Sequence, residues 1–252
     1  MPTDPVVWNG DTVTDVPANG HALLDFNAPL SDARSYDLIS GLRALAGKDV
    51  VDYGCGWAEL LLRIAAHEPG VRAVGVDDDE YAIGRGRAAV AERGLTNVTL
   101  HQADATTWPG RADVAISIGA SHAWGGTQAT LTALRERVTP GGLLLLGDGF
   151  WEHPPTPAAT AVFAQDEFAD LAGLVDLALA GGYRLLGLTT ATLDEWDAFE
   201  SRWCASREHW LLDHPDHPEH AAVQAIVDDH RDGWLKGYRT HLGFAYLTLA
   251  RR

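Results

Sequence analysis

Three aspartates stand where short apolar runs of the sequence end, and two glycines follow the first of them. These residues are Asp52, Gly54 and Gly56, then Asp77, then Asp104. A turn containing Gly54 and Gly56 can bring backbone N–H groups close to a ligand because glycine has no Cβ. A helix expected to begin directly behind this turn adds a partial positive charge. The pattern predicts a site for a nucleotide-like ligand.

The acids suggest how such a ligand would be held. Asp77 can accept charge-assisted hydrogen bonds from both ribose hydroxyls. Asp104 can accept from an adenine amino group, while the N–H of Ala105 donates to a ring nitrogen. An NAD enzyme also has an acid near the position of Asp77, so an NAD-dependent oxidoreductase is the alternative enzyme. The dinucleotide fingerprint Gly-x-Gly-x-x-Gly, however, would need a glycine where this chain has Glu59.

The elements that must position these residues alternate between strands and helices. Short apolar strands between helices predict a parallel sheet covered on both faces, with ligands beyond the carboxyl ends of its strands. We expect strands at 50–53, 71–76, 98–101, 114–118, 143–146, 183–189 and 242–249, and helices at 31–45, 59–67, 81–93, 127–138, 157–180, 192–212 and 219–238.

Asp52-x-Gly54-x-Gly56 resembles motif I of the class I S-adenosylmethionine (SAM) methyltransferases. Asp77 and Asp104 resemble motifs II and III, and the resemblance spans about residues 31 to 150. It implies a Rossmann-like α/β fold with a mostly parallel seven-stranded sheet and a two-helix insertion before the last strand. Ala58 replaces the usual third glycine, and Asp78 replaces a commoner apolar residue. The implied SAM-binding residues are Asp52, Gly54, Cys55, Gly56, Asp77, Asp78, Asp104, Ala105 and Gly119.

We expect one domain of several segments. These are an N-terminal cap and helix (1–48), the SAM-binding core (49–150), a segment with the fifth-strand exit loop, a helix and the sixth strand (151–189), a helical insertion (190–241) and the last strand (242–252). The exit loop itself is expected over 147–155. In the insertion, Trp196, Trp203 and Trp210 fall on one helix face, which predicts a helical hairpin packed through aromatic side chains.

The implied chemistry is in-line transfer of a methyl group to an O, N, S or C nucleophile. His122 is the candidate general base because imidazole exchanges protons near neutral pH; a loop histidine bonded to the backbone is an equal alternative. Asp148 would orient an amine or hydroxyl, or cap the next turn. Trp124, Phe150 and Trp151 would stack on a flat or apolar acceptor.

Composition narrows the partners. A net charge of −16 disfavours nucleic acid and anionic membranes, and the Asn/Asp-Pro-Pro-aromatic motif of nucleic-acid amino-methyltransferases is absent after the fourth strand. The run Ser117–Gly126 also resembles that of uncharacterised bacterial methyltransferases of small molecules. Two cysteines make no disulfide framework, and His214, His217 and His220 are expected to form a polar loop without metal. We therefore expect a cytoplasmic monomer or homodimer acting on a small molecule; a non-catalytic SAM-fold module is the alternative outside enzymes.

Overall fold

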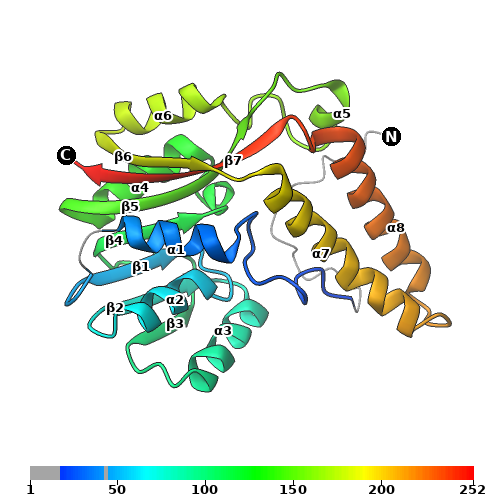
Figure 1. The fold of residues 1–252 in the computed structure, drawn as a ribbon, viewed down its shortest axis with the longest axis horizontal. Helices are drawn as coiled ribbons and strands as arrows, with labels where there is room; N and C mark the ends of the chain where they lie inside the picture. Colours follow the sequence, from blue (N-terminus) through cyan, green and yellow to red (C-terminus); the bar gives the residue numbers. More distant parts are fainter. Residues whose placement is uncertain (1–17, 43–44) are drawn as a thin grey trace. The chain divides into compact units, whose positions relative to one another are not determined.

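The computed structural model describes residues 18–42 and 45–252, so the first part of the predicted N-terminal cap, 1–17, lies outside the described residues. The chain divides into two compact units. We name the first the core unit (Ser31–Gly149, Leu171–Thr190 and Phe244–Arg252) and the second the helical unit (Met1–Leu30, Phe150–Asp170 and Ala191–Gly243). Each is described by itself, with the elements labelled in Figure 1.

A seven-stranded sheet has the strand order β3-β2-β1-β4-β5-β7-β6. The pairs β1–β2, β1–β4, β2–β3 and β4–β5 are parallel, while β6 and β7 are antiparallel. This arrangement confirms the predicted mostly parallel Rossmann-like sheet. The strands are β1 Asp49–Tyr53, β2 Arg72–Asp77, β3 Val98–Gln102, β4 Ala112–Ile118, β5 Val138–Trp151, β6 Tyr183–Thr190 and β7 Leu242–Arg251.

The register of the central strands aligns the predicted site residues. Asp52 lies opposite Gly75 of β2 and Ile116 of β4, and Tyr53 lies opposite Val76. Parallel strands end at the same edge of a sheet, so Asp77 and the turns after β1 and β4 meet there. Four of the five β1 residues are buried, so this central strand is covered on both faces of the sheet.

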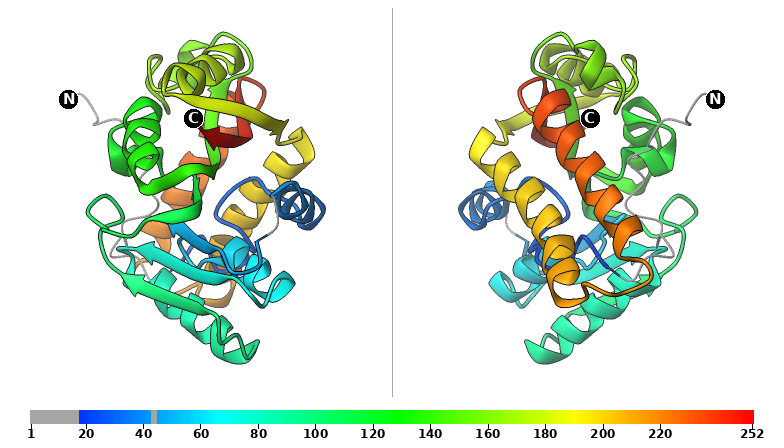
Figure 2. Two further views of the ribbon diagram at one scale, coloured as in Figure 1. Left: turned by 90° about the vertical axis from the view of Figure 1, so that its left-hand side faces the viewer. Right: turned by 90° about the vertical axis from the view of Figure 1, so that its right-hand side faces the viewer.

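Helices cover both faces of the sheet in the core unit (Figure 2). A Cβ at Gly75 of β2 would contact Leu61, so α2 lies on that face of the sheet. Gly75 is paired with Asp52 of β1, and the residue after Asp52, Tyr53, points to the opposite face. There its ring contacts Trp124, which precedes α4. Ion pairs join α1 to α2 and α2 to α3. The helices of this unit are α1 Asp32–Gly41, α2 Glu59–His67, α3 Glu80–Glu92, α4 Thr127–Arg137 and α6 Leu171–Ala180.

Two predicted elements are wrong. The single helix expected over 157–180 is two helices, α5 Pro157–Thr160 and α6, because the segment between them pairs with the end of β5. The Trp151 N–H donates to the Ala169 carbonyl, and the Trp151 indole donates to the Gln165 carbonyl. For the same reason the first part of the expected exit loop, 147–151, continues the β5 strand.

The helical unit contains the predicted hairpin, formed by α7 Leu193–Asp213 and α8 His220–Asp232, which lie side by side in Figure 1. The last turns of the expected second helix are a π-helix, Gly233–Tyr238 (η2). Glu200 of α7 is fully buried, and its carboxylate is bonded by the Tyr238 hydroxyl at 2.8 Å and by His230 Nε2 at 2.6 Å. This polar cluster joins α7, α8 and η2.

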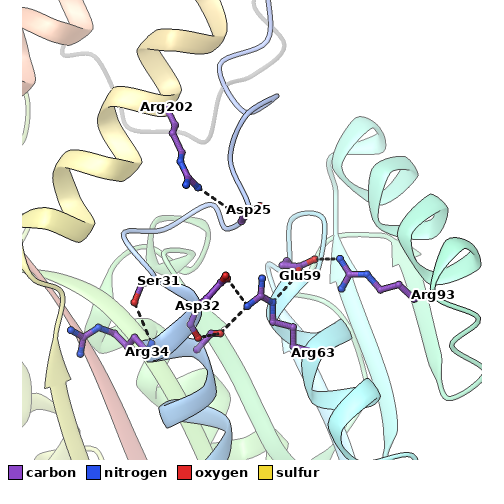
Figure 3. A network of polar contacts seen from close by, with 9 residues as sticks. Asp25, Ser31, Asp32, Arg34, Glu59, Arg63, Arg93 and Arg202 are labelled. Carbon is purple, nitrogen blue, oxygen red and sulfur yellow. Dashed lines mark hydrogen bonds and ion pairs between the residues drawn. The ribbon is translucent and has the colours of Figure 1, made fainter.

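Aromatic rings complete the hairpin. His230 stacks on Trp203 at 3.7 Å between ring centroids, and the Arg207 guanidinium lies over the same indole. Trp210 instead stacks on His214 at the tip of the hairpin. An ion pair of 2.8 Å from Arg202 to Asp25 fastens the segment before α1 to α7 (Figure 3). Trp203 and Trp210 therefore make different contacts, although they share one helical spacing.

Two glycines on α3 predict opposite changes in stability. A Cβ at Gly86 would lie 2.8 Å from the Trp57 carbonyl oxygen, whereas a Cβ at Gly84 would meet nothing within 4 Å. Gly86→Ala should lower the free energy of unfolding by about 1–2 kcal/mol, because α3 must move off the turn after β1. Gly84→Ala should raise it by about 0.5–1 kcal/mol through helix propensity. Denaturant unfolding measures both; a stabilised Gly86→Ala variant would contradict the close packing.

Candidate active site

The turn after β1 contains three residues with positive φ. Gly54 has φ 79°, Gly56 has φ 53°, and Ala58, the N-cap of α2, has φ 63°. Ala58 is the one non-glycine residue with positive φ in the described part of the chain. Its left-handed conformation costs roughly 1–2 kcal/mol relative to glycine. Alanine therefore stands where the motif that this turn resembles usually has its third glycine, and it adopts a backbone conformation that favours glycine.

Gly54 is required by packing as well as by its φ. A Cβ built on Gly54 would lie 2.5 Å from the Cβ of Ala120, in the turn after β4. The turns after the two neighbouring strands therefore touch. Gly119, a predicted cofactor residue, begins the second turn with φ 69° and donates its N–H to the Gly147 carbonyl at 2.9 Å. A small residue at each strand end permits this approach.

Asp77 holds the first turn in place. Its Oδ2 accepts the Gly56 N–H at 2.7 Å and its Oδ1 accepts the Asp79 N–H at 3.0 Å. Each carboxylate oxygen has two acceptor positions, so one on each oxygen remains for a ligand hydroxyl. Burial raises the pKa of Asp77 above its ordinary value, and the two N–H bonds oppose that rise. Asp77 is therefore both a loop anchor and a possible ribose ligand.

Asp52 is a buried acid without a hydrogen bond from any described residue. The residue is 5% exposed. Burial, and then the charge of Asp77, raise the pKa of Asp52 to about 7. A buried carboxylate without a donor is costly unless a cation or donor meets it. Together with the open space beside Gly56, Asp52 fits a positively charged ligand lying over the turn.

Cys55 lies inside the turn, where its thiol packs toward Gly75. Burial and the charges of Asp52 and Asp77 raise the pKa of this thiol well above its ordinary value. The thiol is consequently a packing group and not a nucleophile. Gly75 is needed because any Cβ there would lie 2.9 Å from the Cys55 sulfur.

The predicted adenine residues follow β3. Asp104 is exposed, and its Oδ1 accepts the N–H and the hydroxyl of Thr106 at 2.7 and 2.6 Å, which lowers its pKa. Ala105 beside it is buried. Asp78 is exposed at the end of β2, and its carbonyl accepts a 3.5 Å bond from Gln102. Asp79 caps α3 by accepting the Ala82 N–H.

Glu59, which occupies the third position of the dinucleotide fingerprint, is neutralised by two arginines (Figure 3). It accepts from Arg63 at 2.8 Å and from Arg93 at 2.6 Å. Arg63 also pairs with Asp32 of α1 at 2.7 Å. This chain of ion pairs fixes the first turn of α2. Asp52 and Asp77, the other acids near the turn, have no cationic partner among the residues that the structure describes.

The turn after β4 carries the candidate base. His122 is exposed on the 3-10 turn Ser121–Trp124 (η1). Asp148 lies beneath it, 2% exposed, and accepts from the Ser121 hydroxyl at 2.9 Å, the Thr127 hydroxyl at 2.7 Å and the Gly149 N–H at 2.9 Å. Burial raises the pKa of Asp148. The carboxylate ties η1 to the start of α4.

The candidate stacking residues lie in different surroundings. Trp124 packs edge-on to Tyr53 and beneath the Arg137 guanidinium. Phe150 and Trp151 belong to the helical unit, where Phe150 packs on Gly243 and Trp151 on Phe168. The structure brings together Asp52, the glycine turn, Asp77 and Gly119 in the core unit, with Asp104 and His122 on the loops that follow β3 and β4. It does not bring Phe150 and Trp151 into that unit.

Sequence reasoning missed the residues that shape the turn from other elements. Because Gly75 and Gly86 have no Cβ, the Cys55 sulfur and the Trp57 carbonyl can pack closely against them. The Ala120 methyl group packs against Gly54 in the same way. Arg85 lies over the Trp57 indole at 4.2 Å. A glycine inside a predicted strand and another inside a predicted helix were the available signals, because both weaken their elements unless something packs closely against them.

Comparison with known proteins identifies the class. Residues 45–171 match the family described as "Methyltransferase domain", about half of the chain, and the chain belongs to that family. The prediction from the three aspartate positions is confirmed: this is a class I SAM-dependent methyltransferase.

In the described residues, no helix combines the length and apolar character needed to cross a bilayer.

Individual relatives agree with this assignment. The uncharacterized protein YjhP of Escherichia coli strain K12 is 26% identical over 231 residues, which cover 89% of this chain and 93% of YjhP. The crystal structure of a SAM-dependent methyltransferase from Thiobacillus denitrificans, solved with S-adenosyl-L-homocysteine (SAH), is similar to this chain with a TM-score of 0.84 and 25% sequence identity. The match covers 92% of this chain and 96% of the Thiobacillus chain. The ubiquinone biosynthesis O-methyltransferase of Azoarcus strain BH72 is 33% identical over 109 residues, 42% of this chain and 46% of its own.

The raised pKa of Asp52 predicts a pH-dependent stability. Because this pKa is about 7 in the folded chain, the folded chain holds the proton more tightly than the unfolded chain. Its stabilising contribution is complete at low pH and is lost as the pH rises through 7. The stability of Asp52→Asn relative to the parent should therefore grow by about 2 kcal/mol between pH 5.5 and 8.5, measured by denaturant unfolding at each pH.

Asp104→Asn is the matched control for this pH series. Hydrogen bonds from Thr106 lower the pKa of Asp104, so Asp104 is ionised throughout that pH range. The difference between Asp104→Asn and the parent should stay constant from pH 5.5 to 8.5. Parallel profiles for Asp52→Asn and the parent would contradict the raised pKa.

Proposed function

We propose that this protein transfers the methyl group of SAM to an O, N, S or C nucleophile of a small molecule. The observation that carries the proposal is the pair of acids at the strand ends. Asp52 and Asp77 both have raised pKa values, and the charge of Asp77 is one cause of the shift at Asp52. Two carboxylates that repel each other at one turn favour a cationic ligand.

SAM meets that requirement, since it carries a sulfonium and an ammonium group and supplies an electrophilic methyl group when bound. Asp52 would face the positively charged amino acid part, and Asp77 would accept the ribose hydroxyls at its two remaining acceptor positions. Asp104 would accept from the adenine amino group and the Ala105 N–H would donate to the ring. NAD would instead bring an anionic pyrophosphate to the same turn, where the two acids would repel it.

The acceptor side is proposed from the turn after β4. His122 is exposed there and would take a proton from a neutral hydroxyl or amine. Asp148 would act through Ser121 and Thr127, which it holds, and not on the acceptor itself. Trp124, on the same turn as His122, would stack on a flat or apolar acceptor.

The proposed acceptor is a small molecule and not a polymer. The net charge of −16 disfavours nucleic acid, and the Azoarcus relative is named for O-methylation in ubiquinone biosynthesis. That match covers less than half of the chain, so hydroxylated aromatic compounds form the first panel to test and amines and thiols the second. A cytoplasmic location and a monomeric or homodimeric state belong to the same proposal.

Removal of the ribose acid tests the cofactor site. Asp77→Ala should weaken SAH binding by about 10- to 100-fold, because charge-assisted hydrogen bonds to the ribose and the anchor of Gly56 are lost together. Titration calorimetry with SAH measures the change, and the melting temperature without ligand shows whether the variant is folded. Asp37→Ala, an exposed acid on α1, is the charge-matched control. Equal SAH affinity in Asp77→Ala and the parent would remove Asp77 from the site.

Removal of the candidate base tests the chemistry. His122→Ala should lower kcat by about 10²- to 10⁴-fold if imidazole removes the acceptor proton. The affinity for SAH should stay within roughly twofold, because the imidazole would contact the acceptor and not the cofactor. Radiolabelled methyl transfer to the acceptor panel provides the rate. His67→Ala, at the exposed end of α2, should behave as the parent. A raised KM with near-normal kcat would assign His122 to acceptor positioning instead.

A further inference from the structure

Arg137, the last residue of α4, binds three backbone carbonyls. Its Nε donates to the Trp108 oxygen at 3.3 Å, its Nη1 to the Ala133 oxygen at 3.1 Å and its Nη2 to the Thr106 oxygen at 2.5 Å. Thr106 and Trp108 belong to the loop that leaves β3. The planar guanidinium presents its donors in a rigid fork, which suits several acceptors around one group. Arg137 therefore joins α4 to this loop.

The same guanidinium lies against two aromatic rings. Its central carbon is 4.8 Å from the centroid of Trp124 and 5.9 Å from that of Tyr53. Tyr53 in turn donates its hydroxyl to the Gly110 carbonyl at 2.7 Å, farther along the loop. The loop after β3 thus has two anchors, Arg137 and Tyr53, and both also contact Trp124 in the turn that carries His122.

One residue connects Arg137 to the acid proposed for adenine. Thr106 gives its carbonyl to Arg137 and directs its N–H and hydroxyl to Asp104 Oδ1, at 2.7 and 2.6 Å. Asp104 itself is exposed. An exposed carboxylate turns freely unless neighbouring donors select one rotamer. Here those donors belong to Thr106, the residue whose carbonyl Arg137 binds.

We propose that Arg137 is a positioning residue that orients the Asp104 carboxylate, through Thr106, toward the amino group of the cofactor's adenine. The inference rests on the proposed role of Asp104 in cofactor binding. Without the Arg137 guanidinium, the Tyr53 hydroxyl would still hold the loop at Gly110. Thr106, which orients the Asp104 carboxylate, would lose the hydrogen bond to its carbonyl. Recognition of the adenine amino group would weaken, while contacts to the ribose and the amino acid part would not.

The discriminating measurement is the preference for SAH over S-inosyl-L-homocysteine, which has an oxygen in place of the adenine amino group. Titration calorimetry gives both affinities. Asp104→Ala should reduce the preference for SAH by about tenfold, the worth of a charge-assisted hydrogen bond. Arg137→Lys keeps the charge at the helix end but cannot span three carbonyls. It should reduce the same preference by about threefold or more, with little change in affinity for the inosyl compound.

Two further variants complete the test. Arg111→Lys, an exposed arginine before β4, is the matched control and should keep the parent preference. Thr106→Val removes the hydroxyl donor to Asp104 but retains the carbonyl that Arg137 binds, so it should lower the preference even if Arg137→Lys fails to fold. An equal loss of affinity for both ligands in Arg137→Lys would overturn the inference, because it would indicate general destabilisation.

The outcome also separates this inference from the function on which it rests. If Asp104→Ala lowers the preference but Arg137→Lys and Thr106→Val retain it, Asp104 recognises adenine without this support and the inference is wrong. If Asp104→Ala retains the parent preference, the proposed role of Asp104 fails first and Arg137 has no adenine contact to position. Binding of SAH through Asp77 would stand in either case.

Discussion

The hydrogen bond from the Gly56 N–H to the Asp77 carboxylate is the constraint on which the site depends. At 2.7 Å it joins the turn after β1 to the end of β2, and the Gly54 and Cys55 N–H groups add bonds of 2.9 and 3.1 Å to the Val76 carbonyl. The turn is therefore shaped by the neighbouring strand before any ligand binds. Such preorganisation lowers the ordering cost of binding. It also explains the positive φ values, since the chain must turn back sharply to reach Asp77.

Satisfying the turn in this way places negative charge at the edge of the sheet. Burial raises the pKa of both Asp52 and Asp77, and the charge of Asp77 adds to the rise at Asp52, because the Coulombic energy of two acids grows as the dielectric constant falls. Glu59 does not add to this charge because Arg63 and Arg93 neutralise it. The structure thus distinguishes acids with protein partners from the two that retain capacity for a ligand, and a sulfonium cofactor matches the second group.

The sequence was sufficient for the fold and for the acids at the strand ends, because each depends on local pattern. Asp52, Asp77 and Asp104 directly follow or end apolar runs, and strand ends converge at one edge whatever the register. Gly75, Gly86, Ala120 and Arg137 were not predicted, since their roles depend on which residue faces them across elements. The helix expected over 157–180 was wrong for a related reason: pairing of Trp151 with the 165–169 segment outweighed helix propensity.

Ala58 shows how strongly the rest of the structure determines this turn. A left-handed alanine costs roughly 1–2 kcal/mol, and such strain persists only where the surroundings leave no alternative. Here Gly54 is fixed against Ala120, Gly56 is bonded to Asp77, and the close approach of α3 at Gly86 fixes the Trp57 carbonyl. Alanine also has fewer unfolded conformations than glycine, which recovers part of the cost. Three neighbouring elements therefore impose on Ala58 a backbone shape that favours glycine, and the alanine at this position does not weaken the case for cofactor binding.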